Sequence, residues 1–297
     1  MQKRVQNIMH IRNFVQNLNK SVLEGTNEDE MVNKIVTKKA SIRFEKLGVE
    51  PFKSKLETLQ EALRDRFPKS HMPRVQAFNI DLTNPNSVQV DQDRAYELHM
   101  ASADNVHALK IGNHGFDYSV RNYVSFEQQK EMFLYVVDMI MRTMDLKYIG
   151  HLSMHNINMF AFDAEGEAAN IRKNSPFCVT DKGIDDVWQC VGAATRHDYE
   201  LDDGLIGLTI HSTIAHAGQS FIPQPEWELW QFMGGIPVVQ ERSLLLTISV
   251  AHHQQGKEQR IPQGFSLVNL DLQDVENQFD QIHVHLNRTY DSITKES

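Results

Sequence analysis

The chain has 297 residues, 41% of them apolar and 23% charged, which is typical of a folded protein rather than a disordered one. Its formal charge of −9 argues against binding to duplex DNA or to an anionic membrane, because both need a basic field. Two cysteines cannot form a disulfide framework or a cysteine-based zinc site, and no apolar run is long enough to cross a bilayer. We therefore expect a single cytoplasmic domain.

The first third of the sequence is predicted to be helical. Residues 5–22 place apolar side chains three and four positions apart, as an amphipathic helix does, at Ile8, Ile11, Val15, Leu18 and Val22. A second helix is expected over residues 28–48 and a third over residues 53–67. A helical subdomain over residues 1–70 is thus one way to divide the domain.

The middle of the chain predicts strands, interrupted by one long helix. Apolar runs on either side of the turn at residues 84–86 indicate a hairpin, and residues 95–112 could continue the sheet. A wide apolar stripe after Ser125 predicts the long central helix, with Ser125 and Gln128 in the pattern of a capping box. The β-rich body is expected over residues 71–270.

The last third contains the strongest strand signals. Residues 147–163, 204–216 and 236–253 are rich in residues that favour strands, and a connection containing Pro and Trp joins the last two. Spacings of three and four then predict a C-terminal helix over residues 271–288, with its apolar seam at Leu272, Val275, Phe279, Ile282 and Leu286. The predicted class is α+β, with a largely antiparallel sheet, a helical N-terminal third, one long central helix and a C-terminal helix.

Two of the expected strands carry a histidine and a hydroxyl on one face. Residues i and i+2 of a strand project to the same side, so His151 lies beside Ser153, and His211 beside Thr213. On neighbouring strands these side chains would surround one cleft. One imidazole could then remove a proton from an attacking oxygen and the other protonate the leaving oxygen, while the hydroxyls hold the phosphate oxygens.

The paired His-x-Ser/Thr strands resemble those of the two-histidine phosphoesterases, which cleave nucleotide phosphodiesters without a metal ion. The resemblance implies a metal-independent phosphodiesterase that uses no cofactor, with His151 and His211 as acid and base in an order that the sequence leaves open. The ligand would be small and anionic or nucleotide-like. Positive charge and stacking surfaces for it are expected from Arg172, Arg196, Trp227 and Trp230.

Two other interpretations stay open. A mononuclear metal enzyme could combine two of the 14 histidines with a carboxylate such as Asp163 or Asp198, although no metal ligand can be assigned from the sequence. Alternatively, the apolar seams of the two terminal helices suit a non-enzymatic self-assembling or partner-binding protein, such as a virion component. Pairing of these helices between chains would give a homo-oligomer.

Overall fold

The chain divides into two units, Met1–Lys34 and Ile35–Ser297, and the second is the one described below. The computed structural model describes residues 34–73, 77–80, 88–91, 96–163, 166–179, 192–201, 205–254, 268–269 and 271–294. The predicted helix over residues 5–22 lies outside these ranges.

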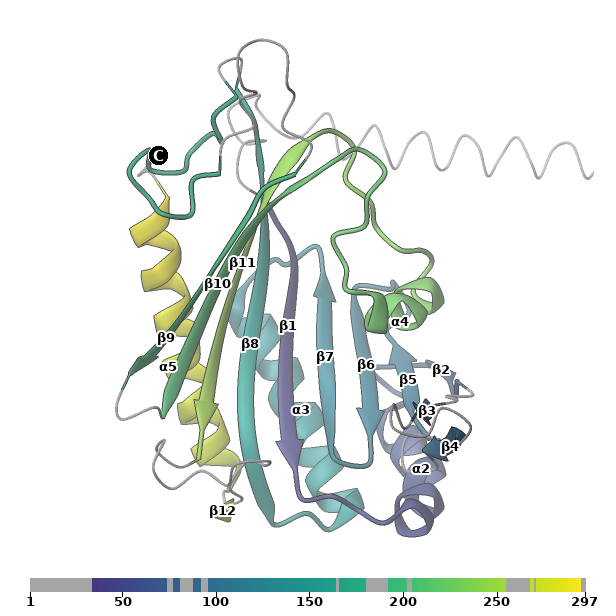
Figure 1. Cartoon of the computed structure of the whole chain (residues 1–297). Helices are drawn as coiled ribbons and strands as arrows, with labels where there is room; N and C mark the ends of the chain where they lie inside the picture. Colours follow the sequence, from purple (N-terminus) through teal and green to yellow (C-terminus); the bar gives the residue numbers. More distant parts are fainter. Residues whose placement is uncertain are drawn as a thin grey trace, which may run out of the picture. The chain divides into compact units, whose positions relative to one another are not determined.

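The described helices are separated by one or more strands, except that α4 follows η4 directly (Figure 1). In chain order the elements are β1 (Lys34–Phe44), α2 (Val49–Leu63), β2 (Lys69–His71), β3 (Ala77–Ile80), β4 (Val88–Asp91), β5 (Leu98–Ala101), β6 (His107–Gly112), β7 (Gly115–Arg121), α3 (Phe126–Met144), β8 (Tyr148–Ala161), β9 (Ala194–Leu201), β10 (Ile206–Ala215), η4 (Gln224–Glu226), α4 (Trp227–Phe232), β11 (Ser243–His253), β12 (Val268–Asn269) and α5 (Leu272–Ile293).

Ten of the described strands form one sheet in the order β2-β5-β6-β7-β1-β8-β11-β10-β9, with β12 pairing with β8. Strands β3 and β4 form a separate hairpin, as the turn at residues 84–86 predicts. Neighbouring strands are antiparallel. Between β1 and β8, the N–H of Glu45 donates to the carbonyl of Tyr148, which places the end of one strand at the start of the other. The predicted α+β class with a largely antiparallel sheet is confirmed.

The prediction of a helical N-terminal third is wrong where the structure describes it. Residues 34–44 form β1, a strand in the middle of the sheet, and only α2 of the expected helices in this region is found. Along β1 the buried residues Ala40 and Ile42 alternate with more polar ones, a period of two that the helix prediction overlooked. Strand β7, which pairs with β1, was also not predicted.

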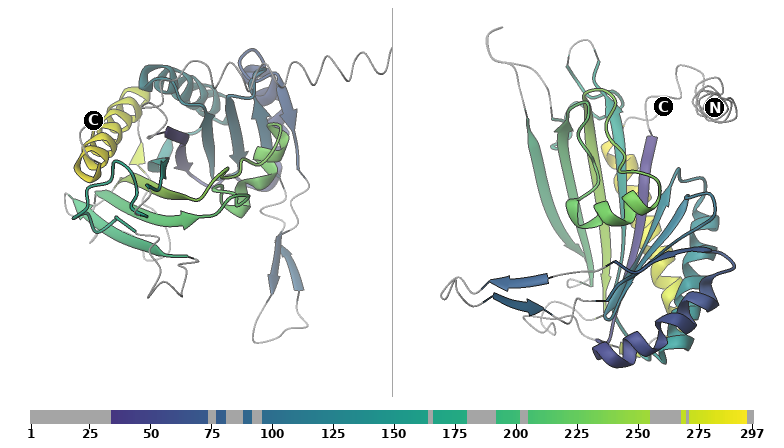
Figure 2. Two further views of the ribbon diagram at one scale, coloured as in Figure 1. Left: turned by 90° about the horizontal axis from the view of Figure 1, so that it is seen from above. Right: turned by 90° about the vertical axis from the view of Figure 1, so that its right-hand side faces the viewer.

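Helices α2, α3 and α5 cover one face of the sheet, whereas η4 and α4 lie on the opposite face (Figures 1 and 2). The main core lies between the sheet and the three long helices. The predicted helix after Ser125 is α3, and the Ser125 hydroxyl accepts a hydrogen bond from the N–H of Gln128 as expected of a cap.

The C-terminal helix packs against its own chain. Its predicted seam is buried against β8, β11 and α3 at Val275, Phe279, Ile282 and Leu286. Phe279 stacks on Phe133 of α3 with ring centroids 4.5 Å apart. The expectation that this seam pairs between chains is therefore corrected, because its apolar surface is already used within the core.

One charged side chain lies inside this core. Lys38 of β1 is 1% exposed, and its ammonium group lies 3.7 Å from the centre of the Tyr123 ring. Burial lowers the pKa of Lys38 from 10.5 to about 8, because the charged form loses its hydration. The fold therefore disfavours the protonated amine below pH 8, and that cost disappears as the pH rises from 8 to 10.5.

We predict that Lys38→Met stabilises the protein at pH 7. The methionine removes the buried charge and keeps a side chain of similar length, so the free energy of unfolding should rise by about 1 kcal/mol after the lost cation–π contact is counted. Urea unfolding at pH 7 and pH 10 measures the difference between variant and wild type. The gain should shrink at the higher pH. A destabilised variant at pH 7 would contradict the account.

Candidate functional site

The sheet face opposite the three long helices carries the polar side chains of the central strands. Alternation along β1 and β8 turns apolar residues toward the helices and the residues between them toward the other side. We call this other side the polar face. It contains a cavity of about 430 Å³, which is lined by Lys39, Ser41, Arg43, His151, Ser153, His155, Thr209, Ser249 and His253 among others.

A histidine between two serines lies in this cavity. The Nδ1 atom of His155 is 2.6 Å from Ser249 Oγ, and its Nε2 atom is 3.4 Å from Ser153 Oγ. Burial, together with the positive charges of Lys39 and Arg43, lowers the pKa of His155 to about 4. The imidazole is thus neutral at pH 7 and presents one N–H donor and one acceptor.

A pair of imidazoles also lines this cavity. His151 of β8 and His253 of β11 face each other in the sheet register, and their Nδ1 atoms are 3.4 Å apart. A hydrogen bond between these two atoms requires a proton on one Nδ1 and none on the other. Gly207 leaves room for this pair, because a Cβ there would lie 3.3 Å from Nε2 of His253.

The positive charges of the cavity come from β1. Asp117 of β7 accepts from Arg43 at 3.0 Å and lies 3.5 Å from Lys39, whose ammonium group is also 2.7 Å from Glu226. Burial would raise the pKa of Asp117, but the charges of Lys39 and Arg43 outweigh it and lower that pKa to about 2. The carboxylate therefore stays ionised and positions both cations.

The structure does not bring His151 and His211 together. Strand β11 lies between β8 and β10, so the two histidines are not on neighbouring strands as expected. Across β11, His151 pairs with His253, whereas His211 pairs with Thr247, six residues along the strand. That register separates them by about 20 Å. The predicted acid–base pair cannot act on one phosphorus atom.

The expected substrate-binding residues are also dispersed. Arg196 neighbours His211 in the sheet, and the guanidinium of Arg196 binds Asp198 at 3.1 Å. Thr213 neighbours Ala194 on the same pair of strands. Arg172 donates to the carbonyls of Thr294 and Asp291, where it fastens the end of α5. These contacts correct the assignment of both arginines to one ligand site with His151.

The two tryptophans of the connection between β10 and β11 have structural contacts. Trp230 is 1% exposed and stacks beneath the guanidinium of Arg121 at 4.8 Å, so it is an anchor of α4 and not a stacking platform. Trp227 is more exposed, at 41%, and its indole N–H donates to the carbonyl of Ile222. Only Trp227 keeps a ring surface that a ligand could reach.

Sequence reasoning found His151 and Ser153 but missed their partners in the cavity. The spacing of His151, Ser153 and His155 puts all three on one face, which extends the predicted pattern by two residues. Ser249 and His253 join them through the pairing of β8 with β11. No local pattern indicates that pairing, because register depends on residues far apart in the sequence.

The described residues contain no cluster of metal ligands. No group of three or more His, Cys, Asp or Glu side chains there is arranged to hold an ion. His283 and His285 lie on α5, where successive residues turn by about 100°, so their rings diverge as the helical pattern implies. Among the described helices we also find none with the length and apolar content needed to cross a membrane.

Comparison of the chain with models of protein families and with curated protein sequences finds no match. The resemblance to two-histidine phosphoesterases therefore stays an interpretation of two short stretches of sequence. In the sheet, the strand register keeps the histidines of these stretches, His151 and His211, apart. Any assignment of function depends on the cavity itself.

Proposed function

We propose that the protein binds a small phosphate-bearing anion in the cavity around His155. The observation that supports this is the convergence of hydrogen-bond donors from three strands: Lys39 and Arg43 from β1, His155 and Ser153 from β8, and Ser249 from β11. Positive charge beside hydroxyls and imidazoles is the chemistry that binds phosphate oxygens.

The charges at the cavity indicate where the anion would bind. Lys39 and Arg43 share the single carboxylate of Asp117, which leaves one positive charge in excess among these three side chains. Asp198 and Glu200 of β9 also line the cavity, and Asp198 is paired with Arg196. Glu226, from the segment that folds onto the polar face, balances that charge through Lys39. A bound anion would replace or compete with this carboxylate, so the ligand and Glu226 oppose each other electrostatically.

The properties of Ser249 and His155 favour binding of a ligand over catalysis. Their 2.6 Å contact has the geometry of a nucleophile and its base. However, a histidine with a pKa of about 4 is a weak base at pH 7 and removes a hydroxyl proton poorly. The same neutral imidazole is a suitable donor to a ligand oxygen.

Sulfate, whose charge does not change between pH 5 and pH 8, is the probe for this proposal. We predict that Glu226→Gln tightens sulfate binding about threefold to tenfold in calorimetry, because it removes the competing charge beside Lys39. Lys39→Met should weaken binding at least tenfold, on the order of a lost charged hydrogen bond.

Glu276→Gln is the matched control. Glu276 lies 2.8 Å from Lys130 on the opposite side of the molecule, so this variant changes the net charge equally without touching the cavity. Its sulfate affinity should equal that of wild type. Equal gains in both Glu variants would mean that only net charge matters, and no saturable binding by the wild type would overturn the proposed function.

Phosphodiester cleavage is the second candidate, and the contact between His151 and His253 favours it. Hydrolysis needs a proton removed from water and another delivered to the leaving alkoxide. In the hydrogen bond between these imidazoles one Nδ1 carries the proton and the other accepts it. The donor ring then has an unprotonated Nε2 that can act as base, and the acceptor ring has an Nε2–H that can act as acid. His253 thus takes the role first expected of His211.

We predict that His151→Ala and His253→Ala each reduce hydrolysis of a chromogenic phosphodiester at least 100-fold. His211→Ala should leave the rate within twofold of wild type, because His211 lies far along the sheet. A rate that depends on His211 alone, or no hydrolysis by the wild type at any concentration of substrate, rules out this second function while leaving the binding site unaffected.

A further inference from the structure

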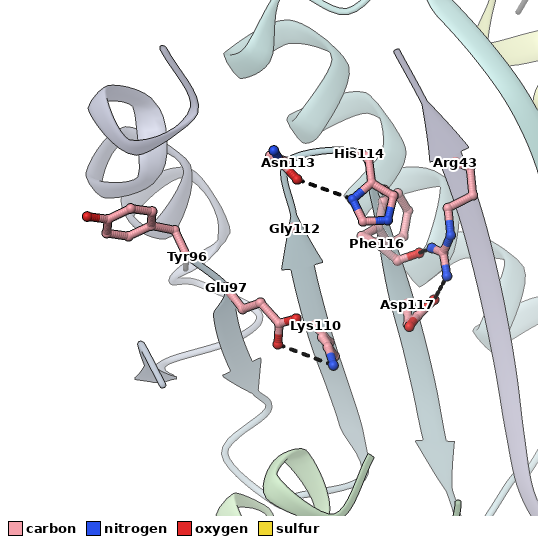
Figure 3. A pocket seen from close by; sticks show the side chains of 10 residues that line it. Arg43, Tyr96, Glu97, Lys110, Gly112, Asn113, His114, Phe116 and Asp117 are labelled. Atoms are coloured by element: carbon pink, nitrogen blue, oxygen red, sulfur yellow. Dashed lines mark hydrogen bonds and ion pairs between the residues drawn. The ribbon is translucent and has the colours of Figure 1, made fainter. Parts of the chain in front are cut away.

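Charged side chains on the polar face pair between neighbouring strands. Lys110 of β6 contacts Glu97, which comes just before β5, at 3.2 Å, and Arg43 of β1 donates to Asp117 of β7 at 3.0 Å (Figure 3). Gly115 permits the second pair, because a Cβ there would lie 2.7 Å from Cδ of Arg43. Each of these charges therefore finds its partner on the next strand.

Strand β9 departs from this pattern at the end of the sheet. Its Arg196 and Asp198 project to the same side and pair with each other, two residues apart on one strand. Among the strands that the structure describes, none pairs with β9 on the side away from β10. Strand β9 has eight residues and no proline, whereas β2, at the other end of the sheet, has three residues and lies between Pro68 and Pro73. A long edge of this kind is a template for another strand.

The strand register shows which backbone groups of β9 point away from β10. The carbonyl of Ala193 accepts a hydrogen bond from the N–H of Ile214, and bonded pairs alternate with unbonded pairs along an antiparallel ladder. The groups that point outward are therefore the N–H and C=O of the even-numbered residues Ala194, Arg196, Asp198 and Glu200. Another strand can bond to them without disturbing the pairing of β9 with β10.

We propose that β9 pairs antiparallel with β9 of a second copy of this chain, around a two-fold axis at His197. Pairing through the outward groups places even-numbered residues opposite each other, so an axis at Arg196 or Asp198 would bring like charges face to face. An axis at His197 instead puts Arg196 of each copy opposite Asp198 of the other. Tyr199, a large apolar side chain that is exposed in the single chain, then lies beside Thr195 of the second copy. The dimer thus extends the cross-strand pairing of charges to the edge of the sheet.

Sedimentation velocity of the full chain at pH 7 and low salt tests this dimer, which does not depend on the anion site. One pair of strands is a small contact beside the roughly 1,200–2,000 Å² of a stable interface, so we expect dimers to form at about 10–100 μM. Arg196→Asp and Asp198→Arg should each raise the dissociation constant at least tenfold, since like charges then face each other twice. The double variant should restore the constant to within threefold, because opposite charges are again paired.

Glu131→Arg is the matched control for Asp198→Arg. It makes the same change of net charge on α3, where Glu131 is exposed and 3.7 Å from Arg66, and should leave the dissociation constant unchanged. A wild type that stays monomeric up to about 500 μM overturns the proposal, since even a weak interface forms at that concentration. A dimer that neither charge reversal weakens also overturns it, because the contact must then lie on another surface.

A cross-link locates the axis. In the proposed register the two copies of His197 form a pair without hydrogen bonds, with Cα atoms about 4.5 Å apart, which a disulfide can span. With Cys178 and Cys190 replaced by serine, His197→Cys should therefore form a disulfide-linked dimer in oxidised glutathione. Arg196→Cys is the control, because its two copies would be about 9 Å apart, too far for a bridge. Linkage through Arg196→Cys, or none through His197→Cys, contradicts the register.

Discussion

Alternation of side chains along the central strands is the constraint on which the site depends. Every second residue of β1, β8 and β11 is turned toward α3 and α5, where burial of apolar surface stabilises the fold. The residues between them must then face the other side of the sheet. A polar residue at these positions costs little, so Lys39, His155 and Ser249 can be brought together there without weakening the core.

The interaction of Asp117 with two cations gives this polar face its internal order. Lys39 and Arg43 are four residues apart on β1, so their side chains project to the same side of the sheet. The carboxylate of Asp117, on the adjacent strand β7, contacts both. Glu226 then attaches the segment between β10 and β11 to the same lysine. Because an unpaired charge in a partly buried position lowers stability, this arrangement couples the position of that segment to the charge in the cavity.

The parts of the fold that could be predicted from the sequence are those with one clear period. The helices α3 and α5 and the strands β8, β10 and β11 were identified because their apolar spacing matches only one kind of element. Residues 34–44 were not, since their Ile, Val and Ala positions also fit part of a helical stripe and their strand partner β7 lies more than 70 residues away. Tertiary pairing decided this segment, not local preference.

The site was predicted only in part for a related reason. His151 and Ser153 could be assigned to a face from their spacing alone. Which histidine lies opposite His151 depends on strand order and register, and these place His253 there and put His211 six residues farther along. Arg43 and Asp117 could not be recognised either, because their roles follow from the close approach that Gly115 permits.

The most direct test of the anion site is the nitrogen NMR signal of the His155 imidazole as sulfate is added at pH 5.5. Burial and the nearby cations keep its pKa at about 4, and a bound anion should raise that pKa and protonate the ring. His283 is the internal reference: its pKa is also lowered to about 4 by burial and by Lys38, but its ring stacks on Phe126 on the helical side of the sheet. The account predicts a saturable shift of His155 toward the protonated form while His283 stays unchanged. Parallel shifts of both histidines, or none at saturating sulfate, would contradict it.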